Sequence, residues 1–194
     1  QPVEILASLR AMPNMLVMRP ADAVEAAECW EVAMTHRTGP VSLVFARQNL
    51  PVVRTVHTDE NRSARGAYVL HEAGCGARQV TLLATGSEVL LAVQARAMLE
   101  AQGIGCAVVS MPCWELFDEQ DAGYRAATLG NSVRVAVEAA CRMGWDAYLG
   151  ARGGFIGMSG FGASGPPDAR YEKFGITAGA VVAEAKRLLH ADAA

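Results

Sequence analysis

The sequence predicts an α/β protein with three layers, in which a mostly parallel sheet carries helices on both faces, preceded by the partial end of another α/β unit. Three observations support this prediction. Apolar runs of strand length occur at 80–84, 106–110 and 133–138. Helix-like segments of mixed polarity separate these runs, and glycine marks several of the junctions. Because the runs at 80–84 and 106–110 are mainly apolar rather than alternating, they indicate strands buried on both faces, as in parallel sheets.

The first 58 residues contain two expected strands and one expected helix. Short apolar runs at 15–18 and 41–46 have the length of buried strands. Between them, Asp22 and Glu25 have the spacing of a capping box, which predicts a helix start. Two strands are too few for a complete domain of this class. Residues 1–58 are therefore predicted to be the end of a larger unit.

A polar stretch at 52–65 separates this unit from the next one. It contains arginine, histidine, aspartate and glutamate, with few large apolar side chains beyond Val56. Such a composition is typical of a connection between domains. We therefore expect a linker at 59–65 and a second unit at 66–194.

The second unit alternates strands and helices. Its expected strands are at 67–70, 80–84, 106–110, 133–138 and 155–158. Its expected helices extend from an N-cap at Ser87 to about Gln102, from Asp118 to about Leu129, and from a cap at Thr177 toward the last residues. The last of these helices has apolar residues spaced for one face.

Composition excludes several classes of function. The chain is 52% hydrophobic and 19% charged, which is typical of a globular α/β protein and not of a disordered one. A net charge of −3 provides no basic surface for nucleic acid or for an anionic membrane. No apolar run approaches the roughly 18 residues of a membrane span. We therefore expect neither nucleic acid nor membrane as a partner.

The five cysteines are odd in number and form no CxxC pair. This pattern favours reduced, buried thiols in a cytoplasmic protein over a disulfide framework or a zinc site. The four histidines lack the spacing of a metal motif. Glu138, at the end of an expected strand, is interpreted as a buried, paired carboxylate rather than a catalytic one.

Arg47 is the strongest candidate for ligand binding. It follows the strand expected at 41–46, and ligands of open α/β sheets bind beyond the carboxyl ends of the strands. The planar guanidinium suits a phosphate or a carboxylate. A surface arginine with a purely structural role is the alternative, and position alone favours that alternative.

Two further segments could hold an anion. The turn Thr85–Glu88 leads from a strand into a helix, where free N–H groups can bind an anion, but helix capping by Ser87 explains the turn without a ligand. The stretch 153–167 contains six glycines. It lacks an adjacent lysine for a phosphate cradle, so a loop packed at an interface is the favoured interpretation.

The chain as a whole resembles the transketolase family. The segments that carry the resemblance include Gln1-Pro2-Val3-Glu4, Arg19-Pro20-Ala21-Asp22, Ala46-Arg47-Gln48-Asn49-Leu50-Pro51, Ala84-Thr85-Gly86-Ser87-Glu88-Val89, Arg134-Val135-Ala136-Val137-Glu138 and Phe161-Gly162-Ala163-Ser164. They occur in order over essentially the full 194 residues. The QPVE and RQNLP elements distinguish this family from related thiamine enzymes.

The resemblance implies a fold and an activity. Residues 1–58 would be the end of the domain that binds the cofactor's pyrimidine, and residues 66–194 would be the family's C-terminal domain. The family transfers a two-carbon ketol unit from a ketose phosphate to an aldose phosphate in the pentose phosphate pathway. It uses thiamine diphosphate with Mg²⁺ or another divalent metal, at the interface of a homodimer.

The resemblance carries one site residue onto this chain. Arg47 occupies the position of the family arginine that contacts the sugar phosphate, so Arg47 is expected to bind substrate. The family's acid/base histidine would immediately precede Gln1, and its metal and diphosphate ligands would lie further upstream. We therefore expect no catalytic, cofactor-binding or metal-binding residue in this chain, which would be an inactive fragment by itself. A chain beginning at Gln1 rather than methionine agrees with that expectation.

Two alternatives remain open. The chain could be a stand-alone ligand-binding or regulatory module with an anion at Thr85–Glu88. It could also be a structural dimerisation piece whose glycine-rich loop and apolar helices pack against a partner.

Overall fold

The computed structural model describes residues 2–192, so Gln1 of the QPVE element lies outside the described residues. Two sheets are formed in this range. The larger has the strand order β3-β5-β4-β6-β7, and the smaller pairs β1 with β2. The strands are β1 (Leu16–Met18), β2 (Val41–Leu43), β3 (Tyr68–His71), β4 (Val80–Ala84), β5 (Cys106–Ser110), β6 (Val133–Val137) and β7 (Gly154–Ile156).

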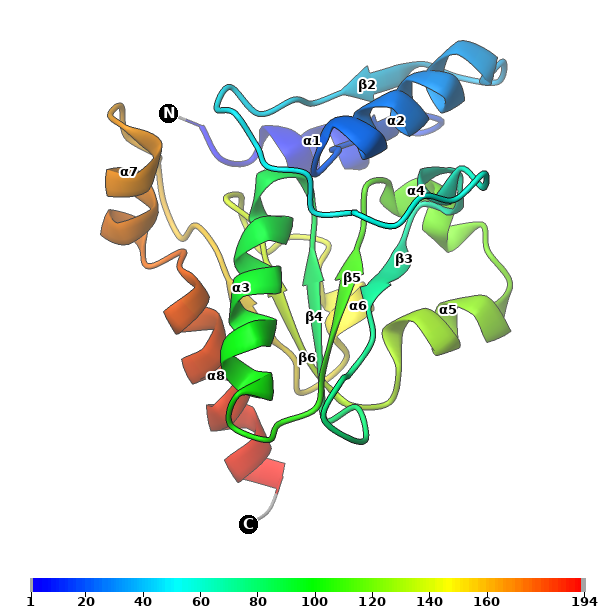
Figure 1. Cartoon of the computed structure of the whole chain (residues 1–194). Helices are drawn as coiled ribbons and strands as arrows, with labels where there is room; N and C mark the ends of the chain where they lie inside the picture. Colours follow the sequence, from blue (N-terminus) through cyan, green and yellow to red (C-terminus); the bar gives the residue numbers. More distant parts are fainter. Residues whose placement is uncertain (1, 193–194) are drawn as a thin grey trace.

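Helices surround both sheets. They are α1 (Ile5–Arg10), α2 (Ala23–Thr35), α3 (Val89–Glu100), α4 (Trp114–Asp118), α5 (Ala122–Leu129), α6 (Asp146–Leu149), α7 (Pro167–Phe174) and α8 (Ala178–Asp192), with 3₁₀ turns η1 (Arg62–Arg65) and η2 (Gly86–Glu88). Figure 1 shows α1, α2 and β2 across one end of the larger sheet, with α3 and α8 on one side and α5 on the other.

The larger sheet is parallel from β5 through β4 and β6 to β7, and only the edge strand β3 is antiparallel. The mostly parallel three-layer fold predicted from the apolar runs is therefore confirmed. Strand β4 is central, and all five of its residues are buried. This explains why its sequence is apolar without alternation, since both of its faces are covered.

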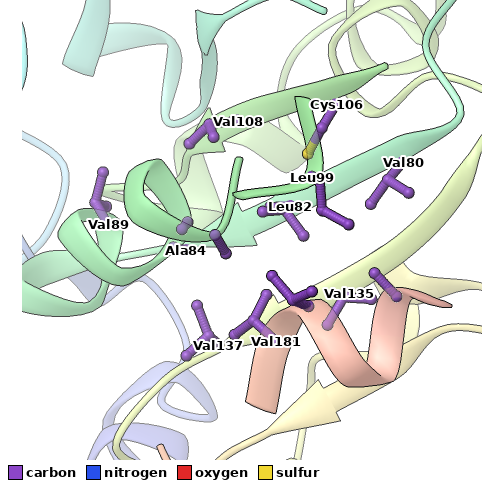
Figure 2. Packing of buried hydrophobic residues seen from close by; sticks show 14 of the residues in the cluster. Val80, Leu82, Ala84, Val89, Leu99, Cys106, Val108, Val135, Val137 and Val181 are labelled. Atoms are coloured by element: carbon purple, nitrogen blue, oxygen red, sulfur yellow. The ribbon is translucent and has the colours of Figure 1, made fainter. Parts of the chain in front are cut away.

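The two faces of the sheet carry separate cores. Alternate residues such as Leu82 and Val108 pack against α3 and α8 on one face, as Figure 2 shows. The intervening residues, such as Leu83 and Val109, pack on the other face against an aromatic group. The rings in that group are Trp114, Phe117, Trp145 and Tyr148.

Several predicted ends of elements are confirmed by capping bonds. The Asp22 carboxylate accepts from the Glu25 N–H at 2.9 Å and begins α2, while the Glu25 carboxylate accepts from the Ala21 N–H at 2.7 Å. Thr177 accepts from the Ala180 N–H at 3.2 Å at the start of α8. These local bonds link sequence directly to structure, because each one joins residues a single turn apart.

Other expectations were wrong. The strand expected over 41–46 ends at Leu43. The helix expected from Asp118 begins later, at Ala122, where the Asp121 carboxylate accepts from the Tyr124 N–H at 2.9 Å, and the short helix α4 ends at Asp118. Ser87 does not cap a helix, since its hydroxyl donates to the Glu88 carboxylate at 2.7 Å. The thiols are free, but Cys75 is exposed and Cys141 is half-buried, whereas buried thiols were expected.

The stretch interpreted as a linker is anchored at both ends. Buried Arg54 forms a two-pronged ion pair with Glu28 of α2. The same carboxylate accepts from the hydroxyl of Ser63 at 2.7 Å and from its N–H at 3.0 Å. The connection is therefore held to α2 at two points along its length, Arg54 and Ser63. The division at 59–65 stays a prediction.

Candidate functional site

Arg47 lies four residues after the end of β2, on the surface of the molecule. The described residues offer its guanidinium neither a hydrogen bond nor an ion pair. The guanidinium thus carries a positive charge, and its N–H donors are not used by the described residues. The next residue, Gln48, turns toward a cleft between the N-terminal elements and the larger sheet.

This interdomain cleft lies at the carboxyl ends of β4 and β6. The chain leaves β4 toward β5 on one side, whereas β6 lies on the other side, so the strand order reverses at this point. Open α/β sheets bind ligands at such a reversal. The cleft has a volume of about 220 Å³. Its polar and charged lining residues are Arg19, Gln48, Ser87, Glu88, Arg170 and Tyr171.

A buried ion cluster lies beside the cleft, and two of its members, Arg19 and Glu88, line the cleft. Arg19 lies between two fully buried carboxylates and donates to Glu138 at 2.6 Å and to Glu88 at 3.2 Å. Arg10 forms a two-pronged pair with Glu138 at 2.9 and 3.0 Å. The Trp145 indole N–H donates to the same carboxylate at 2.8 Å. Glu138 therefore has a structural pairing role, as the sequence predicted.

The electrostatics of this cluster keep both charge types ionised. Burial raises the pKa of Glu138, but the adjacent guanidinium charges of Arg19 and Arg10 outweigh it, and the pKa lies below its ordinary value. Burial lowers the pKa of Arg19, but the two carboxylates outweigh it, and the pKa is raised. The cluster joins the N-terminal elements to the sheet through charge pairs shielded from water.

Acid should weaken this cluster. The folded-state pKa of Glu138 lies below its unfolded value near 4.5, so its contribution to stability is present above that value and lost as the pH falls through the folded pKa. We expect the difference in unfolding free energy between the wild type and Glu138→Gln to shrink from about pH 7 to about pH 3. Urea unfolding at each pH measures it. A difference that widened in acid would contradict the assigned ionisation.

Glu25 responds to pH with the opposite sign. Burial raises its pKa, although the hydroxyls of Ser110 and Tyr68 and the N–H of Ala21 donate to it. Its contribution to stability is therefore present below the unfolded value and lost as the pH rises through the folded pKa. The comparison with Glu138→Gln isolates Glu138, because Glu25 is present in both proteins.

The turn Thr85–Glu88 is occupied by the protein itself. The Gly86 N–H and the Thr85 hydroxyl both donate to the carbonyl of Arg19, at 3.0 and 3.3 Å. Gly86 has a φ of 58°, and a Cβ there would lie 3.1 Å from the Arg19 guanidinium. Sequence reasoning placed a possible anion at this turn, but the structure places a buried arginine against it.

The glycine-rich stretch packs closely where it follows β7. A Cβ on Gly157 would lie 2.3 Å from the Phe155 ring and 2.6 Å from the carbonyl of Glu138. Further along, Gly162 lines the interdomain cleft. Close packing thus explains Gly157, and also Gly153, where a Cβ would lie 2.6 Å from the Leu149 carbonyl.

Among the side chains that the structure describes, those of residues 2–191, no group of three or more from histidine, cysteine, aspartate and glutamate is placed to bind a metal ion. No helix in the same range combines the length and apolar character needed to cross a bilayer.

Comparison with known families decides the assignment. Residues 66–177 match the model of the transketolase-like C-terminal domain, and residues 1–53 match that of the transketolase pyrimidine-binding domain. The chain belongs to the transketolase family. The resemblance found in the QPVE and RQNLP elements is confirmed.

Individual transketolases align along the chain. The transketolase of Cereibacter sphaeroides is 61% identical over 96% of the chain, which covers 28% of that protein. A structure of Pichia stipitis transketolase in complex with sedoheptulose-7-phosphate is 34% identical in sequence and superposes with a TM-score of 0.89. The match covers 98% of this chain and 27% of the Pichia chain. A split-gene transketolase, described as an inactive beta4 tetramer, is 28% identical in sequence with a TM-score of 0.79. This match covers 98% of the present chain and 62% of the split-gene chain. The chain thus spans a little over a quarter of the curated transketolase.

Proposed function

We propose that the chain forms part of a transketolase, which transfers a two-carbon ketol unit from a ketose phosphate to an aldose phosphate. The single observation that carries this proposal is the match to two successive transketolase domains along one chain. Residues 1–58 would end the pyrimidine-binding domain, 59–65 would link, and 66–194 would form the C-terminal domain. Family matches that end at 53 and begin at 66 support this division.

Arg47 is the residue of this chain that would act on the substrate. Its guanidinium is exposed, and its donors are unused by the described residues, so it can form two parallel hydrogen bonds to a phosphate. Holding the phosphate orients the sugar and supplies binding energy remote from the reacting carbons. A relative solved with sedoheptulose-7-phosphate supports this ligand class. No residue of the chain is proposed to be catalytic.

Thiamine diphosphate and a divalent metal are assigned to parts of the enzyme other than this chain. The lack of a metal-binding group among the described side chains of residues 2–191 motivates that assignment. The chain by itself would therefore bind neither and would be inactive.

We further propose a homodimeric, cytoplasmic enzyme. The N-terminal elements expose large apolar side chains that a partner would cover, including Ile5, Met12, Trp30 and Met34. Free thiols support the cytoplasmic location.

A chimera tests the proposed function. The part of Cereibacter sphaeroides transketolase that this chain does not match would be joined to residues 1–194 at the aligned boundary. We expect ketol transfer by the purified chimera, because the chain is 61% identical to the segment it replaces. We expect no transfer by the 194-residue chain alone. A coupled assay of aldose phosphate consumption measures both.

Two outcomes would contradict the proposal. The first is turnover by the chain alone. The second is a folded, cofactor-loaded chimera that transfers no ketol unit. The native Cereibacter enzyme, assayed in parallel, controls for the assay.

A further inference from the structure

The interdomain cleft has the position of a ligand site that the proposed function does not use. One wall comes from the N-terminal elements, through Arg19 and Gln48, and the opposite wall comes from α7, through Arg170 and Phe174. The floor is the point where the strand order reverses between β4 and β6. Small-molecule sites occur preferentially at domain interfaces and at such reversals. Arg47 does not line this cleft.

The charges of the cleft favour an anion. Its charged lining residues are Arg19, Arg170 and Glu88. The Glu88 carboxylate is fully buried and already accepts four hydrogen bonds, so no lone pair is left for a ligand to approach. The donors are the Ser87 and Tyr171 hydroxyls, the Arg19 guanidinium and the Ala139 N–H. Arg19 balances Glu88, and Arg170 is left as an excess positive charge.

Hydrogen-bond donors remain unused around the cleft. Within the described part of the chain, the Nε atoms of Arg19 and Arg170 are buried without a hydrogen-bond partner. Arg19 is itself only 9% exposed, so its unused donor cannot turn to bulk water. The guanidinium of Arg170 makes one long contact, at 3.5 Å, to the carbonyl of Ala163. The described residues also leave the amide of Gln48 without a partner. The buried Nε atoms do not face the open cleft, so the donors that an acceptor there would reach are the terminal nitrogens of Arg170 and the amide of Gln48.

The rest of the lining sets the size and the character of the ligand. Apolar side chains of Val3, Met158, Phe174 and Ile176 line the cleft beside the arginines. A volume of about 220 Å³ is below the range of drug-sized sites. The space suits a compact organic molecule that presents an oxyanion at one end and a small apolar body at the other.

We propose that the interdomain cleft binds a small organic oxyanion, a phosphate monoester or a carboxylate, through Arg170 and Gln48. The anion neutralises the excess charge of Arg170, and the apolar body packs on Phe174 and Met158. Binding connects α7 to the N-terminal elements across the cleft. The inference is independent of the substrate role of Arg47.

Calorimetric titration of the full 194-residue chain tests this site, with phenyl phosphate as the probe. We expect saturable binding with one site, and weaker binding of inorganic phosphate, which lacks the apolar ring. Benzoate distinguishes the two anion sources, since a carboxylate site would favour it over phenyl phosphate. Amide chemical shifts of Ser87 and Ala139 would report the location, because both residues line the cleft.

Variants place the binding in the cleft. Arg170→Leu should weaken phenyl phosphate at least about tenfold, which corresponds to the loss of one charge-assisted hydrogen bond. Gln48→Ala, a milder change, should weaken it less. Arg187→Leu on α8 removes the same charge from outside the cleft lining and should leave affinity unchanged. Arg47→Leu reports any phosphate that is bound at Arg47 instead. Circular dichroism verifies that each variant is folded.

Three results would overturn the proposal. One is the absence of saturable binding for all three probes. Another is unchanged affinity in folded Arg170→Leu and Gln48→Ala. The third is loss of binding in Arg47→Leu alone, which would assign the anion to Arg47 instead.

Discussion

Glu138→Gln should destabilise the chain by about 3 to 5 kcal/mol, because it leaves the Arg10 guanidinium without its counter-charge and leaves Arg19 with Glu88 alone. The carboxylate is fully buried and accepts from Arg10, Arg19 and Trp145 at 2.6 to 3.0 Å. An amide of the same shape retains one acceptor oxygen but turns an NH₂ group toward donors. Two guanidinium groups would then lie beside it with reduced compensation. Equilibrium unfolding in urea measures the loss.

A matched control separates this effect from a general charge effect. Glu172→Gln on α7 makes the same chemical change at an exposed position and should alter stability by less than about 0.5 kcal/mol. If Glu138→Gln were as mild as Glu172→Gln, the buried cluster would not be what joins the N-terminal elements to the sheet.

Arg47→Ala in the chimera should lower kcat/KM for phosphorylated sugars by about 30- to 150-fold, equivalent to about 2 to 3 kcal/mol. A guanidinium that binds a phosphate contributes hydrogen bonds to a charged group, and these are among the stronger ones in water. The loss should be mainly in KM, because the phosphate is bound in the ground state and the transition state alike. An unphosphorylated sugar should be affected little.

Two variants sharpen this comparison. Arg47→Lys keeps the charge but loses the planar fork, so an intermediate loss is expected. Arg37→Ala removes an exposed arginine after the end of α2 and should change neither substrate. Equal losses for phosphorylated and unphosphorylated sugars would reject the phosphate role.

The central strands and two helix caps could be predicted because their causes are local. The runs at 80–84 and 106–110 are mainly apolar, as burial on both faces requires. Asp22 and Thr177 bond to N–H groups three residues ahead. Such signals need no knowledge of the rest of the fold.

Long-range features could not be predicted in this way. The pair formed by Arg19 and Glu138 joins residues 119 positions apart. The sequence around either residue gives no indication that the other is its partner. The polar and glycine-rich residues that line the cleft come from segments that meet only in the folded chain. The antiparallel direction of β3 also depends on its pairing with β5, which follows it in sequence. The role of Arg47 came from the family resemblance, because its position by itself favoured a surface arginine.

A crystal structure of the chimera with sedoheptulose-7-phosphate would test the central claim most directly. The account predicts that the Arg47 guanidinium lies about 2.7 to 2.9 Å from two phosphate oxygens. A sugar phosphate held by other residues, with Arg47 still facing solvent, would contradict it.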